Sequence, residues 1–215
     1  MKDIQAVIFD LDGTLLYTLD DLTDSINYTM EKYGYPVYTV PQIQSFVGNG
    51  LEKLTERALG CRPDNFDEIF NCFKEYYAAH CNEKTKLYDG VKEMIESVKN
   101  KYKMAIVTNK NVTALDALRK IYFDGLIEVI IGQSADLNKK PAPDGVFLAL
   151  QKLGVKKENA IYVGDSEVDV MTAHNSGLPM IACLWGFRSK ETLLSCGAKI
   201  FAEQPSDVIK ILENE

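Results

Sequence analysis

Apolar runs about as long as β-strands recur along this chain and alternate with segments that are apolar at helical spacing. The runs occupy residues 6–9, 104–107, 129–131, 160–163 and 179–182, and a further strand is expected at 199–202, which begins with a lysine. The helical segments of the later region lie at about 91–98, 112–120, 144–153, 169–176, 191–195 and the C-terminus. Runs that are apolar at every position are typical of parallel strands buried on both faces. The alternation therefore predicts an α/β fold, a doubly wound parallel sheet with right-handed crossovers.

A long helical segment separates the first predicted strand from the second. The first strand ends at residue 9 and the second begins at residue 104, whereas a simple βαβ unit takes about 30 residues. Helical spacing is found between them at about 22–33, 51–59 and 66–77. We therefore expect a Rossmann-like core formed by residues 1–15 and 85–215 and an inserted α-helical cap formed by residues 16–84.

Composition and charge exclude several classes of function. The 215 residues carry a formal net charge of −7, so nonspecific nucleic-acid binding is not expected, because clustered Lys and Arg hold the phosphate backbone. No apolar run approaches the roughly 20 residues of a membrane span, and the N-terminus leads into a strand without a signal peptide. Five cysteines without a CxxC pair favour reduced thiols. We expect a cytoplasmic monomer or homodimer with no membrane partner.

Polar groups follow four of the predicted strands at the point where each apolar run ends. They are Asp10 and Asp12 after the first strand, Thr108-Asn109-Lys110 after the second, Lys139-Lys140-Pro141 in the loop after the third, and Asp165 and Asp169 after the fourth. Each group has an ordinary alternative as a turn, a helix cap or a solvated loop. Because ligands bind outside the carboxyl ends of strands in open α/β sheets, we expect these side chains to converge on one crevice.

The order of these motifs resembles the four-motif set of the haloacid dehalogenase superfamily. The matching segments are 10–14, 108–109, 140–141 and 164–169. A helical insertion directly after the first motif is similar to members with a C1-type cap, which include phosphoglycolate phosphatases, pyrophosphatases, some nucleotidases and hexose-phosphate mutases. Haloalkanoate dehalogenases lack the second acid of the first motif, so the presence of Asp12 indicates resemblance to the phosphoryl-transfer members.

The resemblance implies a role for each motif residue. Asp10 would be the nucleophile that forms an aspartyl-phosphate, and Asp12 would protonate the leaving oxygen and then activate water. Lys140 would balance the charge on Asp10 and on the transferring group. Thr108 would hold phosphoryl oxygens, and Asn109 would hold its loop or the substrate.

Magnesium is the cofactor that this resemblance implies. Carboxylates crowded against a phosphate dianion need a cation, and Mg²⁺ prefers oxygen ligands. The side chains of Asp10 and Asp165 and the main-chain carbonyl of Asp12 would be its ligands, with Asp169 orienting a metal-bound water.

The expected cap would select the substrate, because the core motifs recognise only phosphate. Gly48-Asn49-Gly50 is the candidate for a loop that closes over the site, with a plain turn before a helix as the alternative. Arg57 resembles an arginine that follows a similar loop in phosphoglycolate phosphatases. Tyr17-Thr18 departs from the Asp-Ser that these enzymes commonly have, so the cap entrance differs in size and charge.

The sequence thus favours a magnesium-dependent phosphatase that hydrolyses a small phosphorylated metabolite, with phosphoglycolate-like monoesters as the first expectation. A sugar-phosphate mutase would use the same aspartyl-phosphate but return the phosphoryl group to a second hydroxyl. A pyrophosphatase or a nucleotidase of the same superfamily is a further alternative. A noncatalytic phosphate-binding regulatory module would be expected to lack Asp10 or Asp12, and both are present.

Overall fold

The structure of this chain, a computed structural model, describes residues 3–213 except for the side chains of residues 113 and 114. The chain forms two compact units. The smaller is Tyr17–Lys86, and the larger contains the segments before and after it. Two short strands, β2 (Leu16–Tyr17) and β3 (Lys86–Leu87), pair where the chain passes from one unit to the other and back. That the smaller unit acts as a cap stays a prediction.

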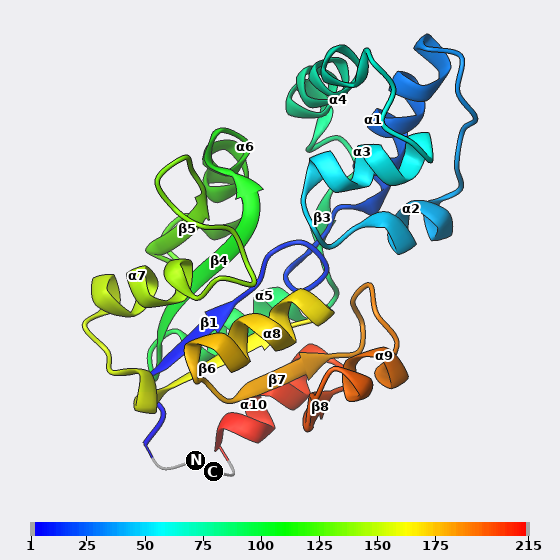
Figure 1. Ribbon diagram of the computed structural model, residues 1–215. Helices are drawn as coiled ribbons and strands as arrows, with labels where there is room; N and C mark the ends of the chain where they lie inside the picture. The colour runs from blue at the N-terminus through cyan, green and yellow to red at the C-terminus, as the bar shows by residue number, and fades with distance from the viewer. Residues whose placement is uncertain (1–2, 214–215) are drawn as a thin grey trace. The chain divides into compact units, whose positions relative to one another are not determined.

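Within residues 3–213, six parallel strands form the sheet of the larger unit (Figure 1). In spatial order they are β5 (Val129–Gln133), β4 (Lys103–Asn111), β1 (Ala6–Phe9), β6 (Ala160–Gly164), β7 (Met180–Cys183) and β8 (Ile200–Ala202). Phe9 at the end of β1 is in register with Ile106 of β4 and Val163 of β6. The predicted parallel α/β sheet is confirmed, and its central strands end at one edge.

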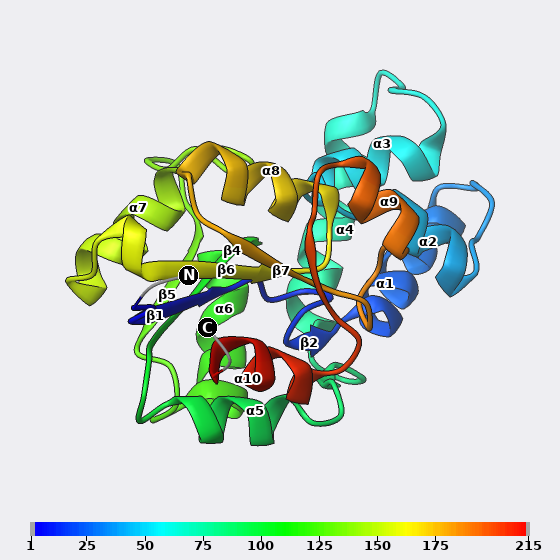
Figure 2. The same cartoon turned by 90° about the horizontal axis from the view of Figure 1, so that it is seen from below.

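Helices cover both faces of this sheet (Figure 2). One face carries α5 (Val91–Val98), α6 (Val112–Leu118) and α10 (Pro205–Glu213), the other carries α7 (Asp144–Leu153) and α8 (Glu167–Ser176), and α9 (Lys190–Ser195) packs beside α8. Val7 and Phe9 belong to the core of the first face, and Ala6 and Ile8 to that of the second. All of them are fully buried, which explains why this strand is apolar at every position.

Some helix boundaries differ from the sequence-based expectation. The helix expected at 112–120 ends early and continues as a π-helical turn, η1 (Arg119–Phe123). A short 3₁₀ turn, η2 (Lys157–Asn159), precedes β6 and has no clear periodicity in the sequence. The helix after β6 begins before Asp169, because the Ser166 hydroxyl caps it by accepting the Asp169 N–H.

The smaller unit consists of α1 (Leu19–Lys32), α2 (Val40–Phe46), α3 (Leu51–Leu59) and α4 (Phe66–His80). Apolar spacing did not predict α2, because this helix is short and buries only Ile43. Its start signals are Pro41 in the first turn and Gln42, whose side-chain oxygen accepts the Thr39 N–H. Across both units, the helices that the structure describes include none long and apolar enough to cross a membrane.

Candidate active site

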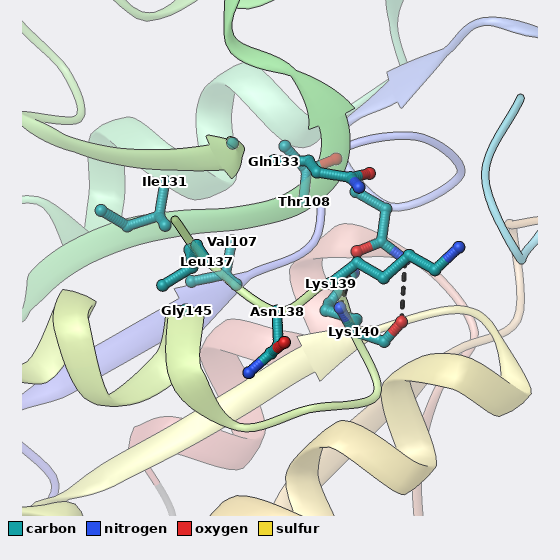
Figure 3. Close-up of a pocket in the computed structure, with 11 residues that line it drawn as sticks. Val107, Thr108, Ile131, Gln133, Leu137, Asn138, Lys139, Lys140 and Gly145 are labelled. Carbon is teal, nitrogen blue, oxygen red and sulfur yellow. Dashed lines mark hydrogen bonds between the residues drawn. The ribbon is translucent and has the colours of Figure 1, made fainter. Parts of the chain in front are cut away.

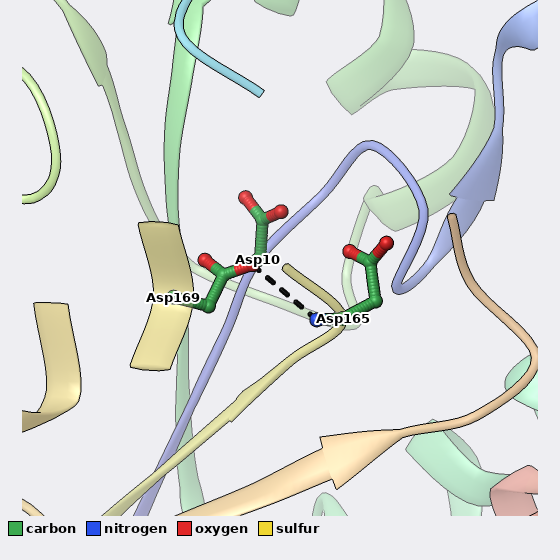
Figure 4. A group of neighbouring side chains, drawn as sticks. All are labelled: Asp10, Asp165 and Asp169. Atoms are coloured by element: carbon green, nitrogen blue, oxygen red, sulfur yellow. Dashed lines mark hydrogen bonds between the residues drawn. The ribbon is translucent and has the colours of Figure 1, made fainter. Parts of the chain in front are cut away.

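Three buried carboxylates meet at the carboxyl edge of the sheet (Figure 4). Asp10 follows β1, Asp165 follows β6, and Asp169 lies in the first turn of α8. Each offers an oxygen, and these oxygens lie within 4.8 Å of one another. Hard oxygen donors at this spacing are suited to a divalent cation such as Mg²⁺.

The ammonium group of Lys140 is embedded in this carboxylate cluster. Its Nζ lies 2.6 Å from Asp10 Oδ1 and 2.7 Å from Asp169 Oδ1. It also donates at 3.1 Å to the hydroxyl of Tyr162, which in turn donates at 3.0 Å to Asp169 Oδ1. Each ammonium proton therefore has an acceptor, which holds Lys140 in one position. Tyr162 lies inside a predicted strand, where the sequence marked it only as part of the core.

Asn109 joins the second motif to the third. Its side-chain oxygen accepts the Lys140 N–H at 2.7 Å, and its amide donates to the Lys140 carbonyl at 3.1 Å. The neighbouring Thr108 hydroxyl accepts the Lys110 N–H at 3.0 Å. Asn109 thus holds the loop that carries Lys140. Its implied role toward its own loop or the substrate stays a prediction.

Asp12 is paired with a lysine to which sequence reasoning assigned no role. Lys110 Nζ lies 2.8 Å from Asp12 Oδ1, and the lysine side chain is only 6% exposed. Lys110 directly follows Thr108 and Asn109 at the end of β4, and that position was the signal that could have identified it. The ion pair fixes the carboxylate of Asp12 at the edge of the site.

Hydrogen-bond donors of neighbouring residues orient the carboxylates of Asp165 and Asp169. Asp165 Oδ1 accepts the Thr14 hydroxyl at 3.0 Å, and Oδ2 accepts the Phe187 N–H at 2.7 Å. Asp169 Oδ2 accepts the Ser166 hydroxyl at 2.6 Å and the Ser166 N–H at 3.1 Å. Thr14 closes the first motif and Ser166 lies within the fourth, whereas no sequence pattern pointed to Phe187.

Burial and the repulsion between neighbouring carboxylates destabilise the ionised forms of Asp10 and Asp165. Burial, with a further contribution from Asp169, raises the pKa of Asp10 well above its usual range, and Lys140 offsets part of the rise. Burial and then Asp169 raise the pKa of Asp165 to about 7. Although burial lowers the pKa of Lys140, Asp10 and Asp169 raise it well above its ordinary value. A charged lysine facing several carboxylates is an arrangement that a divalent cation would stabilise.

The stability of the metal-free protein is therefore expected to fall as pH rises through the titration of Asp165. The folded pKa is about 7 and the ordinary value is 3.8, so between these values the folded state retains a proton that the unfolded chain has lost. The free energy of unfolding then decreases by about 1.4 kcal/mol per pH unit for this group and levels off above pH 7. Asp165→Asn removes this contribution.

Urea denaturation of the wild type and of Asp165→Asn, at several pH values and with a chelator present, measures that difference. The variant is expected to gain stability relative to the wild type from pH 5 to pH 7, with a constant difference at higher pH. Parallel curves across this range would show that Asp165 is not protonated in the folded protein at pH 5 to 7.

A small pocket is lined by residues of β4 and β5 and by the loop that carries Lys140, including Thr108 and Lys140 themselves (Figure 3). Val107, Ile131 and Leu137 contribute its apolar lining. Lys140 contributes both to the lining of this pocket and to the carboxylate cluster.

The residues predicted for substrate selection lie together within the smaller unit. The guanidinium of Arg57 donates to the Phe46 carbonyl at 2.5 Å and to Asn49 Oδ1 at 2.6 Å. Gly48 and Gly50, on either side of Asn49, have φ values of 132° and 88°, which favour glycine. Arg57 therefore braces the loop that precedes α3. Whether this loop contacts substrate stays a prediction.

Comparisons with known proteins agree with the motif pattern. A phosphoglycolate phosphatase of Xanthomonas campestris is 31% identical over 95% of both chains, and the pyrophosphatase PpaX of Listeria monocytogenes is 31% identical over 99% of this chain and 98% of its own. The solved structure of a haloacid dehalogenase-like family hydrolase from Streptococcus pneumoniae superposes with a TM-score of 0.90 at 27% identity, covering 99% of this chain and 100% of that one. The family model described as haloacid dehalogenase-like hydrolase matches residues 7–183. This chain belongs to the haloacid dehalogenase-like hydrolase family.

Proposed function

We propose that this chain is a magnesium-dependent phosphatase that hydrolyses a small organic phosphate monoester through an aspartyl-phosphate on Asp10. The observation that carries the proposal is the buried Asp10 carboxylate 2.6 Å from the Lys140 ammonium, at the strand end where α/β enzymes bind ligands. Similarity to a protein named phosphoglycolate phosphatase supports a phosphoglycolate-like substrate.

The reaction would proceed in two displacements at phosphorus. An oxygen of Asp10 attacks, the bond from phosphorus to the substrate oxygen breaks, and Asp12 gives that oxygen a proton. Water, losing a proton to Asp12, then attacks phosphorus, which releases phosphate and restores the Asp10 carboxylate. Thr108 would hold the phosphoryl oxygens during both steps, Lys140 would balance the charge on Asp10 and on the transferring group, and Lys110 would keep Asp12 in place.

Magnesium would be held by the Asp10 and Asp165 side chains and by the Asp12 main-chain carbonyl. When bound, the ion would neutralise charge on the carboxylates and on the phosphoryl group. Asp169 has less capacity to bind it directly than Asp165, because each of its oxygens already accepts at least two hydrogen bonds. Lys140 and Tyr162 donate to Oδ1, and the Ser166 hydroxyl and N–H donate to Oδ2, whereas Thr14 and Phe187 donate to one Asp165 oxygen each. This supports an indirect role for Asp169, in which it orients Lys140 and the groups around the ion.

The Arg57-braced loop, residues 46–50, would choose among phosphate esters. Arg57→Met removes both hydrogen bonds to this loop, so KM for the preferred metabolite is expected to rise about tenfold, the equivalent of one charge-assisted hydrogen bond. Steady-state kinetics with that metabolite and with p-nitrophenyl phosphate, which lacks its distinguishing groups, measure the effect. The matched control is Arg62→Met, an exposed arginine of the same unit that pairs with Glu52. An equal change in KM for both substrates would remove the loop from substrate selection.

We also propose which ligands the protein binds, its oligomeric state and its cellular location. A small phosphorylated metabolite would be the only ligand besides the ion, and the protein would act as a monomer or homodimer. A cytoplasmic location is supported by the cysteines, since Cys61 and Cys196 are exposed and unpaired, as is usual in a reducing compartment.

Pyrophosphate hydrolysis is the second candidate, because the similarity to PpaX is as strong as that to the phosphoglycolate phosphatase. It would use the same nucleophile and ion, with phosphate as the leaving group. A phosphate-release screen over monoesters and pyrophosphate, with and without Mg²⁺, distinguishes the two. Isomer exchange of hexose phosphates without phosphate release would indicate a mutase instead. No turnover of any compound would reject the enzymatic proposal.

A further inference from the structure

The segment that follows β7 contacts both the first and the fourth motif. Trp185 Nε1 donates to the Thr14 carbonyl at 2.9 Å. Two residues later, the Phe187 N–H donates to Asp165 Oδ2 at 2.7 Å. The segment therefore ties the turn after β1 to the acid at the end of β6, although it lies outside the four motifs.

Gly186, between these two contacts, is packed directly against Asp165. A Cβ at this position would lie 2.3 Å from Asp165 Cβ and 2.5 Å from the Gly13 carbonyl oxygen. Gly186 is absent from the glycines with positive φ, so its backbone conformation is open to other residues. Close approach to Asp165 is therefore the reason that this position requires glycine.

Arg188 anchors the other end of the segment to α8. Its Nε and Nη2 lie 2.7 and 3.2 Å from the two carboxylate oxygens of Glu167. The arginine side chain is 12% exposed, so this two-pronged pair is largely shielded from water. Because Glu167 begins the helix that carries Asp169, residues 185–188 are fixed at both ends to elements of the site.

We propose that residues 185–188 are a positioning clamp that holds Asp165 where it binds a divalent cation and thereby sets the affinity for that cation. The inference rests on the proposed function, which makes Asp165 a ligand. Thr14 and Phe187 each hold one oxygen of Asp165, and Gly186 blocks movement of its Cβ, so the carboxylate is oriented before the cation arrives. Partners that orient ligands commonly change metal affinity by about 10-fold to 100-fold when they are lost.

Titration of the full chain with MgCl₂ by isothermal calorimetry tests the clamp. Gly186→Ala is expected to weaken Mg²⁺ binding by about 10-fold or more, since the added methyl group must displace Asp165. The matched control is Gly197→Ala, where φ is +103° and nothing lies within 4 Å of the added methyl group. That substitution strains the backbone without reaching the site, so its affinity for Mg²⁺ should equal that of the wild type.

A second variant and a spectroscopic signal keep the test decisive if Gly186→Ala does not fold. Arg188→Gln removes the anchor without touching Asp165 and should weaken Mg²⁺ binding by about 3-fold to 10-fold, with Arg188→Lys intermediate. Trp185 is the only tryptophan in the sequence, so its fluorescence is expected to change on addition of Mg²⁺ in the wild type.

The outcomes separate the clamp from the proposed function. Wild-type affinity in both Gly186→Ala and Arg188→Gln would overturn the clamp while leaving Asp165 as a ligand. Absence of Mg²⁺ binding in the wild type would overturn the magnesium assignment itself. Weakened binding in these variants, with a normal Gly197→Ala control, would support the clamp.

Discussion

Asp10→Asn is expected to abolish phosphate release while leaving the folded protein at least as stable as the wild type. The amide cannot act as the nucleophile, so kcat should fall by about 10⁴-fold or more, the scale seen when a covalent nucleophile is removed. The raised pKa of Asp10 means that its ionised form costs stability at neutral pH, and asparagine carries no such charge. Steady-state phosphate release and thermal unfolding of metal-free protein measure the two effects.

The control for this variant is Asp116→Asn, which makes the same change at an exposed position of α6. It should retain wild-type turnover. Substantial turnover by Asp10→Asn would reject covalent catalysis at Asp10. A much lower unfolding temperature for that variant would show instead that the ionised carboxylate stabilises the fold through Lys140.

Lys140→Met is the substitution with the largest expected effect on stability. It leaves the buried carboxylates without their cation, and breaking a buried pair in this way costs about 3 to 5 kcal/mol. The loss should shrink at low pH, where Asp10 and Asp165 become protonated, and when Mg²⁺ is added. Urea denaturation at pH 5 and pH 8, with either a chelator or Mg²⁺, measures the free energy of unfolding.

The same variant should lose about 100-fold to 1000-fold in kcat, because the ammonium that offsets charge on the transferring group is gone. Lys139→Met is the matched control, since Lys139 is exposed and adjacent in sequence. It should change neither stability nor turnover appreciably. Equal stability losses in the two variants at pH 8 would contradict the role of Lys140 in neutralising the cluster.

The core of the fold was predictable because its strands are buried on both faces. The unbroken apolar run of β1 reflects packing of Val7 and Phe9 on one side and Ala6 and Ile8 on the other. Polar residues directly after such runs must lie at one edge of a parallel sheet. The meeting of Asp10, Asp165 and Asp169 was foreseeable for this reason.

Residues that support the site were harder to predict from the sequence, because their roles depend on contacts between residues far apart in the chain. Tyr162 occupies a strand position like any core residue, yet its hydroxyl contacts Lys140 and Asp169. Phe187 contributes a backbone N–H, which almost every residue type could supply, so the sequence does not identify this position. Gly186 is required by close packing on Asp165, and single-sequence periodicity carries no signal for such packing.

Trapping of the covalent intermediate is the most direct test of the central claim that Asp10 carries the phosphoryl group. Borohydride reduces an acyl phosphate to the alcohol, so aspartyl-phosphate at position 10 becomes homoserine. Protein quenched with borohydride during turnover, digested and analysed by mass spectrometry should contain homoserine at position 10, in a substrate-dependent manner and not in Asp10→Asn. Turnover with no homoserine at position 10, or with homoserine at another aspartate, would contradict the account.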